Sequence, residues 1–208
     1  TSHSNATNQI GDYNNNGFDH LLSTTYPPEK WNIVNYNLNA EHQFDSTGTV
    51  LDFATDFTDL NEDDKGIIDN NFYDVNGNEV LQPNNFKNGN TSLTKILASK
   101  LDFTKAFDST ATIEAGLKGS YINATNQYLF QREDLATNSF YTDTTLSNNY
   151  NYNERTLAAY VNYSKSIRHF NFQLGIRGEN TTVNGKNTTS GVVLKHNYSN
   201  LFPNISVD

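Results

Sequence analysis

The acidic run Asp59-Leu60-Asn61-Glu62-Asp63 carries the residue types most suited to chemistry in this chain. Oxygen side chains at this spacing resemble the start of a calcium-binding loop. A complete EF-hand loop needs Gly at its sixth position and Glu at its twelfth, where this chain has Asp64 and Asn70. Two interpretations follow, a calcium site or a solvated acidic loop from Asp56 to Asp64, and the departures from the motif favour the solvated loop.

Signatures of catalysis are missing from the sequence. The five His residues are scattered, Cys is absent, and neither a Gly-x-Ser-x-Gly elbow nor a Gly-rich phosphate loop after a strand occurs. The formal net charge of -9 comes without a basic stripe that would neutralise a phosphate backbone. We therefore predict that the chain is not an enzyme and does not bind nucleic acid, and we assign no catalytic, cofactor-binding or metal-binding residues.

The elements that position the polar residues are predicted to be strands. Seven stretches alternate apolar and polar residues over about ten or more positions, and successive side chains of a strand point to opposite faces. The clearest stretch places Tyr36, Leu38, Ala40 and Phe44 on one face, interrupted only by His42, with Asn, Glu and Gln on the other. The pattern predicts an all-β, antiparallel fold of about seven long strands.

Three tight turns are expected to join these strands in pairs, at Asp45-Ser46-Thr47-Gly48, at Asp108-Ser109-Thr110 and at Arg168-His169. The connections between the pairs, 61–94, 131–149 and 183–193, are rich in Asn, Gly, Thr and Asp and are predicted to be long loops. The apolar residues expected to share one face are Leu51, Phe53, Phe57, Leu97, Leu101, Phe103, Phe107, Ile113, Ala115, Leu117, Tyr121, Leu157, Ala159, Val161, Tyr163, Phe172, Leu174 and Ile176.

Strand length and aromatic spacing indicate a membrane rather than a soluble core. Strands that cross a membrane need roughly nine to eleven residues, whereas soluble sandwiches use about five or six. Eight residues on a strand tilted by about 40° rise about 21 Å, close to the apolar band of about 25 Å between the two aromatic girdles of a barrel. The two predicted girdles, about eight residues apart, are Phe44, Phe107 and Phe172 next to the tight turns, and Tyr36, Phe57 and Tyr121.

The order of the connections also fits an outer-membrane barrel, which has short periplasmic turns and long outer loops. Tight and long connections alternate, so all tight turns fall on one side. Lys105 and Lys165 interrupt the apolar face only near tight turns, where a long stem reaches the headgroups. The hydrophobic content of 35% is compatible with this fold because half of each strand faces a polar lumen. We predict an antiparallel transmembrane β-barrel segment.

Four segments resemble the outer-membrane β-barrel region of TonB-dependent receptors, in particular the barrel family abundant in Bacteroidetes. They are Ile113 to Tyr121, Tyr152 to Tyr160, Phe172 to Thr181 and Leu201 to Ile205, in the family's order. The resemblance implies a cell outer membrane location, a barrel of about 22 strands with an N-terminal plug in its lumen, and a TonB-type energy-transducing partner. It implies a receptor that imports a nutrient such as an iron chelate, a glycan or a peptide.

The chain is expected to supply only part of such a receptor. No signal peptide opens it, and Leu201 to Asp208 enter a strand as the sequence stops. We therefore interpret 1–208 as a partial barrel domain, with 1–33 as an N-terminal outer loop and 34–208 as strands and loops, without plug or TonB-contacting segment. As a fragment it is expected either to stay an open curved sheet or to close artificially through its terminal strands.

Charged side chains on the polar face are the candidate contacts of this wall segment. Either they contact a substrate or the plug, or opposite charges satisfy one another across neighbouring strands, which is the default interpretation. The residues are Lys100, Asp102, Glu114, Lys118, Arg177 and Glu179. Two alternatives to a receptor remain: a soluble or surface-exposed β-rich adhesin or carbohydrate-binding module, and a passive structural barrel.

Overall fold

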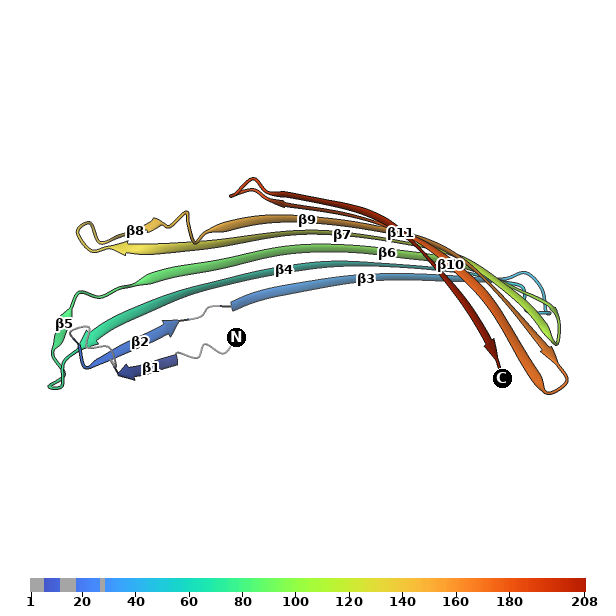
Figure 1. The fold of residues 1–208 in the computed structure, drawn as a ribbon, viewed down its shortest axis with the longest axis horizontal. Helices are drawn as coiled ribbons and strands as arrows, with labels where there is room; N and C mark the ends of the chain where they lie inside the picture. Colours follow the sequence, from blue (N-terminus) through green and yellow to red (C-terminus); the bar gives the residue numbers. More distant parts are fainter. Residues whose placement is uncertain (1–5, 12–17, 27–28) are drawn as a thin grey trace.

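The computed structural model describes residues 6–11, 18–26 and 29–208, and within them the chain forms one antiparallel sheet of eleven strands (Figure 1). Seven strands are long, between 15 and 24 residues, as the sequence predicted. They are β3 (Glu29–Gln43), β4 (Val50–Tyr73), β6 (Phe86–Asp108), β7 (Ala111–Asp134), β9 (Asn148–Ile167), β10 (Phe170–Asn187) and β11 (Val193–Val207). The short strands are β1 (Ala6–Gly11), β2 (His20–Tyr26), β5 (Glu79–Leu81) and β8 (Ser139–Thr142).

The sheet is open and curved, as expected for a fragment (Figure 1). Its main path is β1-β2-β4-β6-β7-β9-β10-β11, while β3 pairs with the first part of β4 and β2 with its last part. The short strands β5 and β8 pair with β4 and β7. In the part of the chain that the structure describes, β11 and β3 do not pair with each other. Each of them therefore has one long edge without a strand partner.

The three predicted tight turns are confirmed and lie at one end of the sheet (Figure 1). At the first turn the Asp45 carboxylate accepts hydrogen bonds from the Thr47 and Thr49 amides at 2.9 and 3.1 Å. Gly48 has a φ of +97°, a left-handed conformation that costs little without a Cβ atom. Asp108 accepts the Thr110 amide at 2.7 Å in the second turn. Side-chain capping of the backbone thus fixes both turns.

The strand register joins the predicted apolar residues into one face, because directly paired residues of neighbouring strands share a face. Tyr36, Phe57, Leu97 and Tyr121 are successive partners on β3, β4, β6 and β7. The girdle predicted from the spacing of Tyr36, Phe57 and Tyr121 is therefore one row of directly paired residues across neighbouring strands. Phe107 is the exception to the register, because it lies at an irregularity between Ala106 and Asp108.

The apolar face has no layer packed on it. Among the described residues, only Ala111 and Ala158 are buried apolar side chains, while Leu38, Leu117 and Leu201 are 61%, 58% and 71% exposed. A soluble sandwich or barrel would bury such a face against a second layer. The described chain therefore has no core of the kind that the soluble alternative requires. The part of the chain that the structure describes contains no helix long and apolar enough to cross a membrane.

Several predicted loops are strands. The acidic run Asp56 to Asp64 lies inside β4, and most of 61–94, 131–149 and 183–193 also belongs to strands. The range 1–33, for which we expected an outer loop, contains β1, β2 and the start of β3 in its described parts. The physical reason is that alternation marks a strand only where its two faces meet different media. Beyond the apolar band both faces meet water, while the backbone ladder continues.

Candidate functional site

The predicted charged side chains lie together on the inner face, opposite the apolar one. In the register, Lys100 of β6 pairs with Lys118 of β7, and Asp102 pairs with Gly116. Arg177 of β10 lies in the same row as Asp102. A hollow of about 530 Å³, here called the inner pocket, is lined by Lys100, Asp102, Glu114, Lys118, Tyr160, Asn162 and Arg177, together with Ile176, Phe202, Pro203 and Asn204. Glu179 lies beside it through its contact with Arg177.

Tyr160 connects two strands that are not neighbours. Its hydroxyl donates a hydrogen bond of 2.6 Å to the Asp102 carboxylate, reaching from β9 to β6 across β7. The residue between them in the row is Gly116, and a Cβ atom there would collide with the Asp102 carboxylate and the Tyr160 ring. Glycine at this position is therefore required by the close approach of two side chains over it. Tyr160 was not among the predicted candidate residues, and Gly116 within a strand was the signal that could have identified it.

Ion pairs in the inner pocket run along strands rather than across them. Lys100 Nζ lies 3.2 Å from Asp102 Oδ2, and Arg177 Nη2 lies 2.6 Å from Glu179 Oε2, both between residues two positions apart. The default interpretation of cross-strand pairing is therefore wrong for these two pairs. Glu114 and Lys118 make no ion pair within the described residues.

Like charges also face each other directly on the inner face. Lys100 is the register partner of Lys118, and the carboxylates of Glu41, Asp52 and Asp102 occupy successive positions of one row. Directly opposed like charges destabilise a sheet. The inner face therefore combines ion pairs along its strands with like charges at neighbouring register positions.

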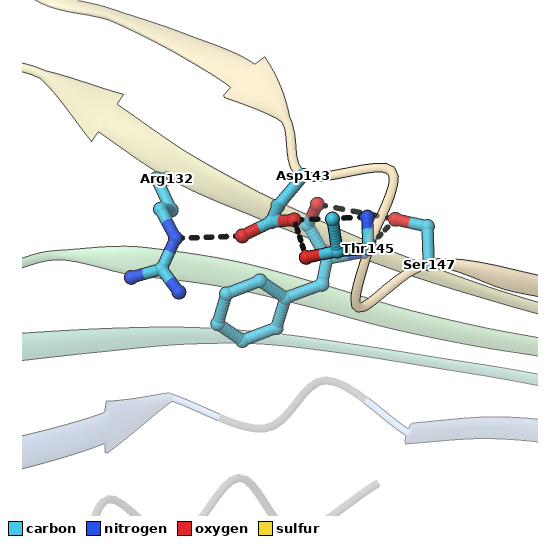
Figure 2. Close-up of polar contacts among 5 residues, drawn as sticks. Arg132, Asp143, Thr145 and Ser147 are labelled. Carbon is cyan, nitrogen blue, oxygen red and sulfur yellow. Dashed lines mark hydrogen bonds and ion pairs between the residues drawn. The ribbon is translucent and has the colours of Figure 1, made fainter.

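A second polar arrangement fixes the connection between β8 and β9 at the far end of the sheet (Figure 2). Arg132 Nε donates a hydrogen bond of 2.8 Å to Asp143, and the Thr145 amide donates one of 3.0 Å to the same carboxylate. Ser147 Oγ accepts the Phe130 amide at 3.0 Å. The Thr145 hydroxyl, followed by Arg132, lowers the pKa of the Asp143 carboxyl to about 2. This connection was predicted to be a loop, and its anchoring residues were not foreseen.

Cation–π contacts reinforce the same region. The Arg132 guanidinium lies 5.4 Å from the Phe86 ring centre and 5.5 Å from that of Phe130, and Lys87 Nζ lies 3.8 Å from the Phe140 ring centre. The end of the sheet away from the tight turns is therefore built as structured backbone with paired charges.

The candidate calcium run does not form a loop. Within β4 the side chains of Asp59 and Asp63 lie on the same face as Phe57, and that of Glu62 lies on the other. Asp59 is 3.8 Å from Lys95, and Asp63 is 2.9 Å from Lys65. Among the residues that the structure describes, no group of three or more His, Cys, Asp or Glu side chains could hold a metal ion.

The model of one protein family covers most of this chain. Residues 42–208 match the outer membrane protein beta-barrel family. The chain belongs to this family. The family places the chain in the cell outer membrane, so the exposed apolar face is the lipid-facing side and the inner pocket faces the barrel lumen. The predicted β-barrel fold, outer membrane β-barrel family and outer membrane location are thereby confirmed.

Among solved structures, one transporter has a similar fold at low sequence identity. The unliganded ferric citrate transporter FecA has a TM-score of 0.50 at 11% identity, and the match covers 91% of this chain but 25% of FecA. The ferric yersiniabactin uptake receptor FyuA from Yersinia pestis and the copper transporter OprC match at 11% identity with TM-scores of 0.39 and 0.40, over 99% and 91% of this chain and 38% of each of theirs. No curated protein matches the chain in sequence.

The lipid-facing side of this outer-membrane barrel segment has a sharp outer boundary. From β4 to β11 the outward side chains of the long strands are mainly apolar up to one position and mainly polar beyond it. At the other boundary Lys165 Nζ lies 2.8 Å from Thr110 Oγ1 at a tight turn, where it was expected. The outer boundary is defined by the positions from which the outward side chains are mainly polar, which on successive strands are Asp59, Lys95, Asn123, Arg155, Asn180 and Ser199.

Proposed function

We propose that this chain is a wall segment of an outer membrane receptor that imports a nutrient. The ligand class is an iron chelate, a glycan or a peptide, too large or too scarce for passive pores. In this proposal the role of the whole protein is transport rather than catalysis. The wall contributes the lumenal surface of the inner pocket and the structured strands beyond the outer boundary.

The inner pocket is the observation that carries the proposal. A small barrel fills its interior with its own side chains, whereas a barrel of about 22 strands leaves a lumen that another element plugs. Seven long strands span about a quarter of the FecA chain, which supports a barrel of the larger class. The unpaired Lys118 and Glu114 and the row of Glu41, Asp52 and Asp102 then face a lumen that an occupant fills.

The mechanism that follows has two parts. The outer strands and loops, together with a plug domain in the lumen, capture the ligand at the cell surface. An energy-transducing protein of the TonB type then rearranges the plug so that the ligand passes along the wall. In the inner pocket, Lys118 and Glu114 are free to exchange partners between plug and ligand as the plug moves, while Tyr160 holds Asp102 in place.

Energised uptake tests the proposal in the organism that encodes the full-length protein. A strain that lacks the gene should grow poorly on one limiting source of iron, glycan or peptide, and the intact gene should restore growth. Uptake of that source should stop when an uncoupler removes the proton-motive force. Uptake that depends on the gene but is insensitive to the uncoupler would indicate a passive barrel. Equal growth with and without the gene on all three classes would contradict the import function.

A charge variant connects the inner pocket to that uptake. Lys118→Gln removes an unpaired lumenal cation and should reduce energised uptake while the barrel still folds. The matched control is Lys186→Gln, because Lys186 is an exposed lysine on the outward face of β10, away from the lumen. A loss of uptake in both variants, or in neither, would argue against a role for the inner pocket.

A further inference from the structure

A shallow groove crosses the lipid-facing side of the sheet. Its volume is about 840 Å³, and it extends from Phe53 on β4 to Leu201 on β11. It lies between two neighbouring outward rows, one through Gly119 and Leu157 and the other through Ala159 and Gly178. The outward side chains that line it are mainly apolar, and they include Phe53, Leu101, Leu117, Leu157, Ala159 and Leu201, so the groove suits a hydrocarbon chain.

The groove continues to the outer boundary of the membrane. A second hollow of about 270 Å³ shares Ser99, Gly119 and Leu157 with the first and ends at Tyr121 and Arg155. Tyr121 belongs to the aromatic girdle, and Arg155 is its register partner on β9. One continuous surface therefore leads from the apolar band to a cation at headgroup level.

Arg155 is exposed and makes no ion pair or hydrogen bond from its side chain within the described residues. The other boundary cation, Lys95, lies 3.8 Å from Asp59. A guanidinium presents a planar fork of donors that matches two oxygens of a phosphate. Arg155 thus has the chemistry for an anionic headgroup, and no protein carboxylate among the described residues occupies it.

Neighbouring amides add donors to the same place. Asn153 Oδ1 accepts hydrogen bonds from the Tyr121 hydroxyl at 2.8 Å and from Asn123 Nδ2 at 2.7 Å. Both bonds use the oxygen of Asn153, so its amide nitrogen keeps its protons for an acceptor at the surface. The end of the groove is therefore rich in donors directed to an acceptor that the protein does not itself supply.

We propose that the groove and Arg155 bind a phosphate-bearing lipid of the outer leaflet. One acyl chain lies in the groove over Gly119 and Ala159, and the lipid phosphate accepts hydrogen bonds from the Arg155 guanidinium. A free phosphate would use only Arg155, whereas a phospholipid uses both the apolar and the cationic part of the surface. The site lies on the opposite face from the inner pocket and is independent of the proposed import.

Native mass spectrometry of the detergent-solubilised full-length protein tests this site. The probes are phosphatidylglycerol, which carries phosphate and acyl chains, diacylglycerol, which lacks phosphate, and glycerol phosphate, which lacks chains. The wild-type protein should bind phosphatidylglycerol most tightly. Arg155→Gln should weaken phosphatidylglycerol binding about fivefold, the effect of one interfacial cation, and leave diacylglycerol binding unchanged. Arg155→Lys should restore part of the affinity, because it restores charge without the planar fork.

Two further variants distinguish the contribution of the groove to lipid binding from that of the Arg155 cation. Ala159→Phe fills the groove and should weaken both phosphatidylglycerol and diacylglycerol, but not glycerol phosphate. Lys186→Gln removes an exposed outward cation remote from the boundary and should change none of them. Equal phosphatidylglycerol affinity of wild-type and Arg155→Gln would overturn the proposal. Glycerol phosphate binding as tightly as phosphatidylglycerol would also overturn it, because a phosphate site without a lipid would then explain the data.

Discussion

Tyr160 on β9 donates a 2.6 Å hydrogen bond to Asp102 on β6, over Gly116, which lies between them on β7 and has no side chain. The same arrangement recurs at Gly175 of β10, where the side-chain oxygens of Asn162 and Asn204 from the two flanking strands approach over the glycine. Gly116 and Gly175 therefore mark two places where side chains of the flanking strands meet over an intervening strand.

A side chain at Gly116 should destabilise the barrel more than loss of the hydrogen bond alone. Tyr160→Phe removes one hydrogen bond to a charged acceptor, worth about 1.5 to 3 kcal/mol. Gly116→Ala displaces both Tyr160 and Asp102, and we expect a larger fall in the thermal midpoint of the full-length protein, measured by heat-modifiable gel mobility. Gly89→Ala is the matched control, because a Cβ atom there makes only ordinary contacts at 3.6 and 3.9 Å. Equal midpoints for Gly116→Ala and Gly89→Ala would contradict this account.

The anchored connection between β8 and β9 should loosen when Asp143 loses its charge. Asp143→Asn weakens the bonds from Arg132 and Thr145, so amide exchange at Thr145 and Ser147 should rise several-fold in hydrogen–deuterium exchange. Thr144→Ala is the control, since Thr144 lies in the same connection without a hydrogen bond to that carboxylate. Unchanged exchange in Asp143→Asn would mean that backbone pairing alone holds this segment.

The same carboxylate predicts a pH dependence. Its pKa of about 2 lies below the ordinary value of about 3.9, so its stabilising contribution is complete above pH 4 and is lost as the pH falls through 2. Protection of the Thr145 amide, corrected for intrinsic exchange, should therefore be constant between pH 7 and about 4.5. A loss of protection within that range would contradict the lowered pKa.

The first tight turn should depend on Asp45 at neutral pH. Hydrogen bonds from the Thr47 hydroxyl, and then from Thr49 and the Thr47 amide, hold the pKa of this carboxyl well below its usual range. Asp45→Ala should therefore slow folding of the full-length protein into lipid vesicles at pH 7. The difference from wild type should vanish in strong acid, because protonation removes the acceptor from the wild type as well. A difference that persists there would assign the effect to something other than the carboxylate.

Spin labels along β6 should report the two faces directly in lipid. Labels at Leu97, Ser99 and Leu101 of the full-length protein should be accessible to oxygen, and labels at Ala98 and Asp102 should be protected from it. Accessibility to a polar relaxant should rise at position 95, beyond the outer boundary. Uniform protection of the outward positions from both reagents would indicate a protein layer on this face.

The sequence predicted the part of the fold that the membrane imposes. Alternation over Leu97 to Phe103 identified the strand, its face and its partners, because lipid and lumen demand different side chains. The alternation did not predict that Asp59 to Asp63 continue strand β4. Both faces of the strand meet water there, so its two sets of side chains do not differ in hydrophobicity. The charged residues of the inner pocket were predicted because they lie on the polar face of the alternating pattern. Their pairing along strands and the contact between Tyr160 and Asp102 were not predicted, because both depend on strand register and side-chain length, which a pattern of residue types does not specify.

The length of β4 has a consequence for how the molecule meets its surroundings. Its 24 residues, tilted by about 40°, rise about 60 Å, of which a hydrocarbon band of about 25 Å takes less than half. Since the strand begins at a tight turn, almost all of the excess stands on the other side, as a rigid collar of hydrogen-bonded backbone. Large particles and surface polymers that rest on the outer leaflet would be held about 30 Å or more from the outer opening of the barrel. A ligand must therefore approach this opening from the bulk solution rather than by diffusion along the membrane surface.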